Sequence, residues 1–359
     1  MRQAARQGTT LIPATTRRAY PGPPVSPPVP TVHVPSAPPS AKAAAPDPGE
    51  SQARPLPPVA TRIDLHQHLL PPEFLDALRS RTVVPRIVDE WTLLTEGEMP
   101  YSINPSAHDV ERRRSQELRE GKGDVLVSIP GNLRVEELPL DDARELIGIW
   151  HRAAVNLGAP FRVWASTPLV EFDLEGLAAM LADDRVVGLQ VPAMSLAKPA
   201  DLVRLEPVLQ LVEDADKPVL VHPRHIVAAP VNGVPAAATT PRSEQLKAAW
   251  STWNAGGRRQ HPTLRIAFIA LAGLAPLMQA ASASRAGKPP KGDPNVFYET
   301  SAYDPRAIDA MARLVGLGLL VHGSDRPFRQ PRDPELGRAS NHAVFSVNPR
   351  ALLTGQPIS

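Results

Sequence analysis

From residue 61 onward, short apolar runs rich in β-branched residues alternate with longer segments of helical periodicity. The segment 140–158 is typical of the helical segments, with Leu146, Ile149, Ala153 and Leu157 at helical spacing. We predict eight strands, at residues 61–66, 124–130, 161–167, 186–192, 218–223, 264–271, 295–301 and 317–325. Strands and helices that alternate eight times over about 300 residues are typical of a (β/α)₈ TIM barrel, the predicted α/β fold.

A doubly wound open sheet is the competing fold. It would carry a glycine-rich phosphate-binding turn after an early strand, and the pattern GxGxxG does not occur in the chain. Residues 81–120 are expected to form a longer, strand-poor insertion in the wall above the barrel mouth.

Residues 1–60 have a different composition. They contain 15 of the 43 prolines and carry a net charge of +4. Such a segment lacks the apolar content to offset the entropy of ordering, so a disordered or polyproline-like tail is expected. A docking role for a proline-binding partner and an extension without function are both open. The predicted organisation is therefore a tail, 1–60, and one barrel, 61–359.

The rest of the chain is close to neutral. The whole chain has a net charge of +2 and residues 1–60 carry +4, which leaves −2 for residues 61–359. No basic stripe with interleaved aromatic residues is present, so a nucleic-acid partner is not expected. No apolar run approaches the roughly 18 residues of a membrane span, and no apolar segment follows the N-terminal arginines as in a secretory signal. The absence of cysteine excludes disulfides and thiolate metal sites and suits a cytoplasmic location.

Residues that can bind metals fall at predicted strand ends, which is where active sites of (β/α)₈ barrels lie. His66 and His68 end the first strand, and residues two apart on a strand face the same side. His222 ends the fifth predicted strand and Asp325 ends the eighth. Three imidazoles and one carboxylate suit Zn²⁺ or another borderline divalent metal. The sequence therefore predicts a metal site at these four residues.

Several motifs occur in the order typical of one protein family. They are "IDLHQH" at 63–68, "LEPVLQLVEDADKPVLVHP" at 205–223, "VHGSDRPF" at 321–328 and "NPRALL" at 348–353. In these motifs the chain resembles the amidohydrolase superfamily, in the branch that contains aminocarboxymuconate-semialdehyde decarboxylase and the resorcylate-type decarboxylases. The resemblance implies that His66, His68, His222 and Asp325 hold one metal ion and that Asp325 is also catalytic, through contact with the metal's water.

The sequence departs from that family at one position. The family carries a histidine on its sixth strand, and in "HPTLRIAFIALAG" Ala270 occupies this substrate-facing place. His225, three residues after a predicted ligand, is the candidate substitute as catalytic acid or base, with a solvated loop histidine as the alternative. Arg224 and Arg326 flank two ligands and are candidates to bind a substrate carboxylate; structural ion pairing is the alternative for both.

Other polar residues in the predicted strands and helices are expected to be structural. Glu299 and Ser301 share a face of the seventh strand, where interior polar packing is expected. His151 and His322 are expected to pack within the fold, whereas His108 is a candidate to reach the site. Gln190 stands where binuclear relatives carry a bridging group on the fourth strand, which favours a single metal.

These features predict a mononuclear metal-dependent hydrolase of an amide, ester or lactone of a small carboxylated or aromatic molecule. Non-oxidative decarboxylation of an aromatic or dienoic acid is the first alternative, and a non-catalytic metal-binding relative is the second. Zinc is the expected metal, with manganese and iron as alternatives. The expected partner is a small-molecule substrate, without membrane association, and a homodimer remains open.

Overall fold

The computed structural model describes residues 61–96, 99–224, 241–283 and 292–356. The proline-rich segment 1–60 and the candidate catalytic residue His225 lie outside the described residues. The tail and the role of His225 therefore stay predictions.

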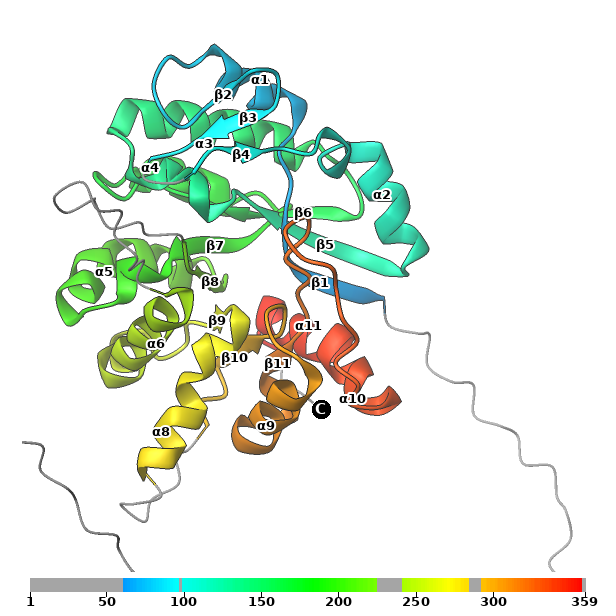
Figure 1. The fold of residues 1–359 in the computed structure, drawn as a ribbon. Coiled ribbons are helices and arrows are strands. Elements are labelled where there is room, and N and C mark those ends of the chain that lie inside the picture. Colours follow the sequence, from blue (N-terminus) through cyan, green and yellow to red (C-terminus); the bar gives the residue numbers. More distant parts are fainter. Residues whose placement is uncertain (1–60, 97–98, 225–240, 284–291, 357–359) are drawn as a thin grey trace, which may run out of the picture. The chain divides into compact units, whose positions relative to one another are not determined.

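Eight parallel strands form the centre of the fold (Figure 1). In sheet order they are β1 (Arg62–His68), β5 (Lys122–Ser128), β6 (Phe161–Ala165), β7 (Val186–Pro192), β8 (Val219–His222), β9 (Ile266–Phe268), β10 (Val296–Glu299) and β11 (Leu320–Val321). The segment after β11 returns to β1, where Leu65 N–H donates to His322 O at 2.9 Å and Asp325 N–H donates to His66 O at 2.9 Å. These bonds bring the first and last strands together, and the predicted TIM barrel is confirmed.

The helices that connect the strands lie outside the sheet (Figure 1). They are α1 (Pro72–Ser80), α2 (Val110–Arg119), α3 (Leu140–Val155), α4 (Leu174–Leu181), α5 (Pro199–Asp214), α6 (Arg242–Thr252), α7 (Arg258–Gln260), α8 (Ala275–Ala283), α9 (Pro305–Val315), α10 (Arg338–His342) and α11 (Asn348–Thr354). Local sequence explains their starts: in α9, for example, the Asp304 side chain accepts hydrogen bonds from the N–H groups of Arg306 and Ala307. Among the described residues, no helix is both long and apolar enough to cross a membrane.

The interior of the barrel below the strand ends is filled with side chains. Trp164 on β6 is fully buried, and its Nε1–H donates to Leu65 O on β1 at 2.8 Å. Gly188 on β7 leaves room for this ring, because a Cβ there would lie 2.6 Å from it. Burial of a ring that covers about 150–250 Å² contributes on the order of 4 kcal/mol. The packed interior gives the strand ends above it a rigid base.

The segment 81–120 contains more strands than expected. It forms an antiparallel sheet of β2 (Arg86–Val88), β3 (Thr92–Leu94) and β4 (Tyr101–Ser102), followed by α2. Strands of two or three residues are too short to show an alternating pattern, so the sequence did not predict them. Asp89 and Glu90, at φ 46° and 63°, make the tight turn between β2 and β3.

The sixth barrel strand, β9, ends earlier than the sequence predicted. It stops at Phe268 rather than at residue 271. Residues 270–274 follow in a turn in which every φ lies between 48° and 64°. Four of these five residues are not glycine, so only the single Gly273 signalled a left-handed turn in the sequence.

Candidate metal centre

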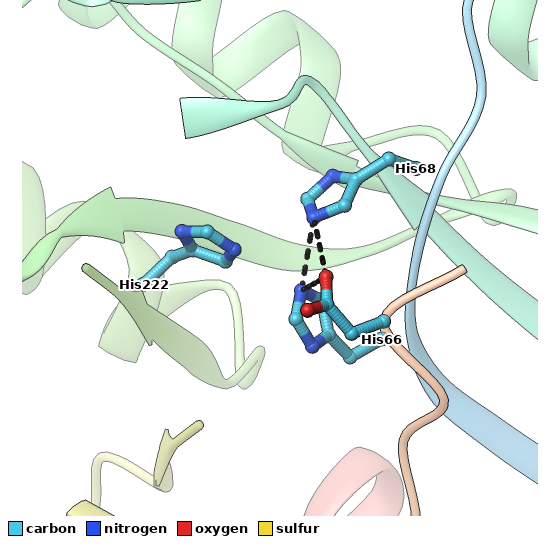
Figure 2. Close-up of side chains that lie close together, drawn as sticks. His66, His68 and His222 are labelled. Atoms are coloured by element: carbon cyan, nitrogen blue, oxygen red, sulfur yellow. Dashed lines mark hydrogen bonds and ion pairs between the residues drawn. The ribbon is translucent and has the colours of Figure 1, made fainter. Parts of the chain in front are cut away.

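Four predicted ligands from three distant parts of the chain converge at the C-terminal ends of the strands. His66 and His68 lie on β1, His222 ends β8, and Asp325 follows β11. One ligand atom of each lies within 4.8 Å of the others. The Nε2 atoms of His66 and His68 are 3.1 Å apart, and Asp325 Oδ1 is 3.8 Å and 3.5 Å from them. Figure 2 shows the three imidazoles turned toward one another.

A bulge in β1 determines which of its side chains reach this cluster. The pairing with β5 shifts between Asp64 and Gln67, where three steps along β1 match two along β5. The shift inverts the alternation of side chains, so Asp64 and Gln67 point to one side, where Gln67 Nε2 donates to Asp64 Oδ2 at 2.7 Å. His66 and His68 point to the other side and face the cluster.

Polar groups face the Nδ1 edges of two of the ligand rings, His68 and His66. His68 Nδ1 lies 3.2 Å from both the carbonyl oxygen and the hydroxyl of Ser128. A proton on Nδ1 can donate there, which leaves the Nε2 lone pair toward the cluster. The Nδ1 of His66 faces Glu299 Oε2 at 3.7 Å. Asp325, at φ 55°, is fixed through its N–H bond to His66 O.

The pKa shifts in the cluster favour neutral imidazoles at His68 and His222 and an ionised carboxylate at Asp325. Burial, with added repulsion from the other rings, lowers the pKa of His222 well below its usual value. Burial also lowers the pKa of His68. Burial opposes ionisation of Asp325, but its bond with His68 and the nearby imidazoles hold its pKa well below the usual range. At His66 burial opposes protonation, and the carboxylates of Glu299 and Asp325 outweigh it and raise the pKa.

A divalent metal ion fits this set of donors. The Nε2 atoms of His66 and His68 lie 3.1 Å apart. When neither carries a proton, their lone pairs repel, and a cation bound by both nitrogens removes this repulsion. Nitrogen ligands about 2.0–2.1 Å from one tetrahedral ion lie roughly 3.3 Å apart. The residues that would hold the ion are thus the four predicted ones.

A cavity of about 540 Å³ opens above the cluster, the size of a pocket for a small molecule. His68, His222 and Asp325 form part of its wall. The other lining residues include Met99, Pro100, Tyr101, Asn132, Arg242, Ala270, Ser301, Tyr303, Phe328 and Arg329. Met99, Pro100 and Tyr101 belong to the segment 81–120, expected in the wall above the mouth. The Phe328 ring lies 5.3 Å from that of His68.

The remaining predicted site residues fall in different places. Ala270 lines the cavity. Arg224 and Arg326 are absent from the lining residues, contrary to expectation, because glutamates neutralise both. Arg224 pairs with Glu137, and Arg326 donates to Glu117 at 2.9 Å. These ion pairs agree with the structural alternative stated for both arginines.

Two other arginines of the cavity wall, Arg329 and Arg242, were not predicted from the sequence. Arg329 donates through Nε to Asp325 Oδ2 at 3.2 Å. Its position four residues after a predicted ligand was the available signal. Arg242 begins α6 and contributes to the lowered pKa of His222, and its place follows only from the fold.

Three of the non-ligand histidines, His108, His151 and His322, have structural contacts. His108 Nδ1 accepts from Leu70 N–H at 3.2 Å and His151 Nε2 accepts from Ser166 N–H at 3.0 Å. Burial lowers the pKa of each to about 3. The His322 ring packs on Phe345 at 4.1 Å. None of these three is among the cavity-lining residues.

No protein-family model and no curated protein sequence matches the chain. Solved structures do match. They include IDCase from Metarhizium anisopliae, at 16% identity and a TM-score of 0.63 over 82% of this chain and 97% of that chain. The manganese-bound 5-carboxyvanillate decarboxylase of Novosphingobium aromaticivorans matches at 15% identity and a TM-score of 0.61, over 82% and 96%. The 2,6-dihydroxybenzoate decarboxylase from Rhizobium matches at 18% identity and a TM-score of 0.58, over 82% of this chain and 98% of that chain.

This chain shares the fold of these three proteins, which agrees with the predicted TIM barrel. Identities below 20% leave the reaction and the substrate of the present protein to the residues of its own cavity.

Proposed function

We propose that this protein is a metal-dependent decarboxylase of a small aromatic carboxylic acid. The observation that carries the proposal is the convergence of three imidazoles and one carboxylate at the base of a cavity with aromatic and arginine side chains in its wall. The fold shared with aromatic-acid decarboxylases supports it. The hydrolase predicted first is not confirmed, and the comparisons favour the decarboxylase alternative.

His66, His68, His222 and Asp325 would hold one divalent ion. When bound, such an ion supplies Lewis acidity that polarises a carboxylate or carbonyl oxygen of the substrate. Manganese is present in one structure of the same fold, and nitrogen and oxygen donors of this kind also suit zinc or iron. We therefore propose a divalent metal of this group rather than zinc specifically.

The cavity wall provides contacts for the substrate. Phe328 and Tyr101, with ring centroids 6.2 Å apart, would pack against an aromatic ring. The guanidinium of Arg329 uses Nε to hold Asp325, and its remaining donors can bind a carboxylate. Decarboxylation breaks the bond between the ring carbon and the carboxylate, so the ring carbon must gain a proton as CO₂ leaves. Asp325 borders the cavity and is our candidate to relay it. Its ionised carboxylate would accept a proton from water and pass it to the ring carbon, and the hydroxide left behind would combine with the CO₂ as bicarbonate.

Hydrolysis of an ester or lactone is the second candidate. It is favoured by Ala270, which places a methyl group in the wall where the resemblance implies a substrate-facing histidine. The same residue is the support for a non-catalytic relative.

A panel of substrates separates these functions. Protein loaded with Mn²⁺ or Zn²⁺ would be incubated with hydroxybenzoates, aryl esters and lactones, and CO₂ and products measured, with His66→Ala as control. We expect CO₂ from a hydroxybenzoate and its loss in the variant. Hydrolysis without CO₂ would support the second candidate, and metal binding without any turnover would support a non-catalytic relative. Turnover that persists in His66→Ala would rule out metal catalysis.

A further inference from the structure

Glu299, at the end of β10, lies beside the proposed metal centre without being one of its ligands. We propose that Glu299 is a positioning residue, which orients His66 for the metal and joins it to the cavity wall at Ala270 and Ser301. The inference rests on the metal site of the proposed function.

One basic side chain faces the buried carboxyl group of Glu299. Its side chain is fully buried. Within the described ranges, His66 is the basic side chain at ion-pair distance from it, and no lysine or arginine pairs with it. A buried carboxylate without a positive partner costs several kcal/mol. An ion held by His66 would supply the missing positive charge.

The Glu299 carboxyl group faces the ring nitrogen of His66 that points away from the proposed metal. Glu299 Oε2 lies 3.7 Å from His66 Nδ1, which is buried and has no hydrogen-bond partner in the described structure. The opposite ring nitrogen, Nε2, is the one that faces His68. A negative charge beside Nδ1 favours the proton there and leaves the Nε2 lone pair for the metal. The 3.7 Å separation exceeds a hydrogen bond, so the contact acts through charge.

The same carboxylate holds two residues of the cavity wall. Oε2 accepts hydrogen bonds from Ala270 N–H at 3.1 Å and Ser301 Oγ–H at 2.9 Å, and Oε1 accepts from Ser301 N–H at 2.5 Å. Ala270 begins the left-handed turn 270–274, in which each non-glycine residue costs roughly 1–2 kcal/mol. Glu299 thus ties the strained turn to a metal ligand.

The barrel leaves space for this carboxylate on its other side. Gly323 follows β11, and a Cβ at this position would lie 2.4 Å from Glu299 Oε1. Any larger residue there would displace the carboxylate from His66 or from Ser301.

Conservative substitution tests the proposal. Glu299→Gln keeps the shape and removes the charge, and Glu136→Gln is the matched control. Glu136 is also a buried carboxyl group, 3% exposed, bonded to Ser166 Oγ at 3.2 Å and not part of the metal cluster. We would measure the Zn²⁺ dissociation constant by chelator competition, the visible spectrum of the Co²⁺-loaded protein, and thermal unfolding of the metal-free forms.

We expect Glu299→Gln to weaken Zn²⁺ binding by about 10–100-fold and to change the Co²⁺ spectrum, with Glu136→Gln like wild type in both. Wild-type affinity and spectrum in Glu299→Gln would overturn the proposal, even if thermal stability fell, because the residue would then be purely structural.

A measurement on the wild type keeps the proposal testable if the variant does not fold. ¹⁵N NMR of histidine-labelled, Zn²⁺-loaded protein should show the His66 proton on Nδ1, and a proton on Nε2 would overturn the proposal. None of these readouts needs turnover. A Glu299 effect in a protein that decarboxylates nothing would contradict the proposed function and leave this inference in place.

Discussion

Two clusters of buried polar side chains lie on opposite sides of β1. On one side, which we call the charged cluster (Asp64, Glu117, Lys122 and Arg326), every charge has a partner. Lys122 Nζ donates to Asp64 Oδ2 at 2.7 Å and Glu117 Oε2 at 2.6 Å, and Arg326 Nη1 donates to Glu117 Oε1 at 2.9 Å. On the other side, His66, His68 and His222 meet Asp325 with imidazole nitrogens facing each other.

The difference shows how to separate structural from functional polar groups in one barrel. Burial opposes ionisation of Asp64, but Lys122 and His322 hold its pKa well below the usual range, so that side is neutralised internally. On the other side, the ligand atoms of the three imidazoles and Asp325 lie within 4.8 Å of one another. Asp325 is the one acidic ligand among them, so its single negative charge cannot pair with all three imidazoles. Arg326 follows Asp325 directly, but its guanidinium lies in the charged cluster and donates to Glu117.

Removing the cation of the charged cluster should have the largest effect on stability. Lys122→Met leaves Asp64 and Glu117 buried without this partner, and we expect a loss of about 3–5 kcal/mol in unfolding free energy. Urea denaturation of the metal-free protein measures it. The control Lys247→Met breaks an exposed pair with Glu244 and should cost less than about 1 kcal/mol. A similarly small loss in Lys122→Met would show that the charged cluster does not hold the barrel together.

Removing a proposed metal ligand should weaken metal binding strongly and change the stability of the metal-free protein little. His222→Ala should weaken metal binding by roughly 10²–10³-fold, because one of four ligands accounts for about a quarter of a metal-binding free energy of ~10–16 kcal/mol. We expect the unfolding free energy of the metal-free form to change far less than in Lys122→Met. Isothermal titration with Zn²⁺ and urea denaturation together test this. If His222→Ala kept its Zn²⁺ affinity and lost stability as Lys122→Met does, both clusters would be purely structural.

His151 is a buried imidazole outside both clusters, and we expect it to affect the pH dependence of stability but not metal binding. Burial lowers the pKa of His151 to about 3, whereas the unfolded chain binds this proton near pH 6.5. Between these values the unfolded state binds more protons, so stability falls as pH falls. His151→Gln should lessen that fall by up to about 3 kcal/mol between pH 6.5 and 4, with metal affinity retained. Denaturation curves at pH 7, 5 and 4 decide it; parallel pH profiles for variant and wild type would contradict it.

The smallest expected effect concerns the strained wall on the metal side. Ala272 is fully buried at φ 54°, and glycine would relieve a left-handed strain of roughly 1–2 kcal/mol. Ala272→Gly should therefore destabilise the protein by about 1–2 kcal/mol less than Ala165→Gly, a buried alanine of β6. Thermal unfolding of both variants provides the comparison, and equal losses would mean that the turn is not strained.

The sequence predicted the barrel and the ligands for physical reasons that need no tertiary information. Each barrel strand is a β-branched or apolar run, and strand ends in this fold meet at one mouth. Two histidines spaced by one residue share a face whether or not a bulge lies before them. His66, His68, His222 and Asp325 could therefore be named together.

Other features depend on partners distant in the sequence. For Arg224 and Arg326 the sequence left substrate binding and ion pairing open, because their partners Glu137 and Glu117 are distant in the sequence. Arg329 and Arg242 reach the cavity through loop and helix geometry that local patterns do not encode. The three strands of residues 86–102 were too short to predict, and the left-handed turn at 270–274 carries one glycine among five residues.

Metal content tests the central claim most directly. Purified wild-type protein would be dialysed with Zn²⁺ or Mn²⁺, freed of loosely bound ions, and analysed by inductively coupled plasma mass spectrometry beside His222→Ala. The metal centre predicts about one equivalent per chain in the wild type and a clear loss in the variant. Less than about 0.3 equivalents in the wild type, or equal content in both proteins, would contradict the assignment of these residues to a metal site.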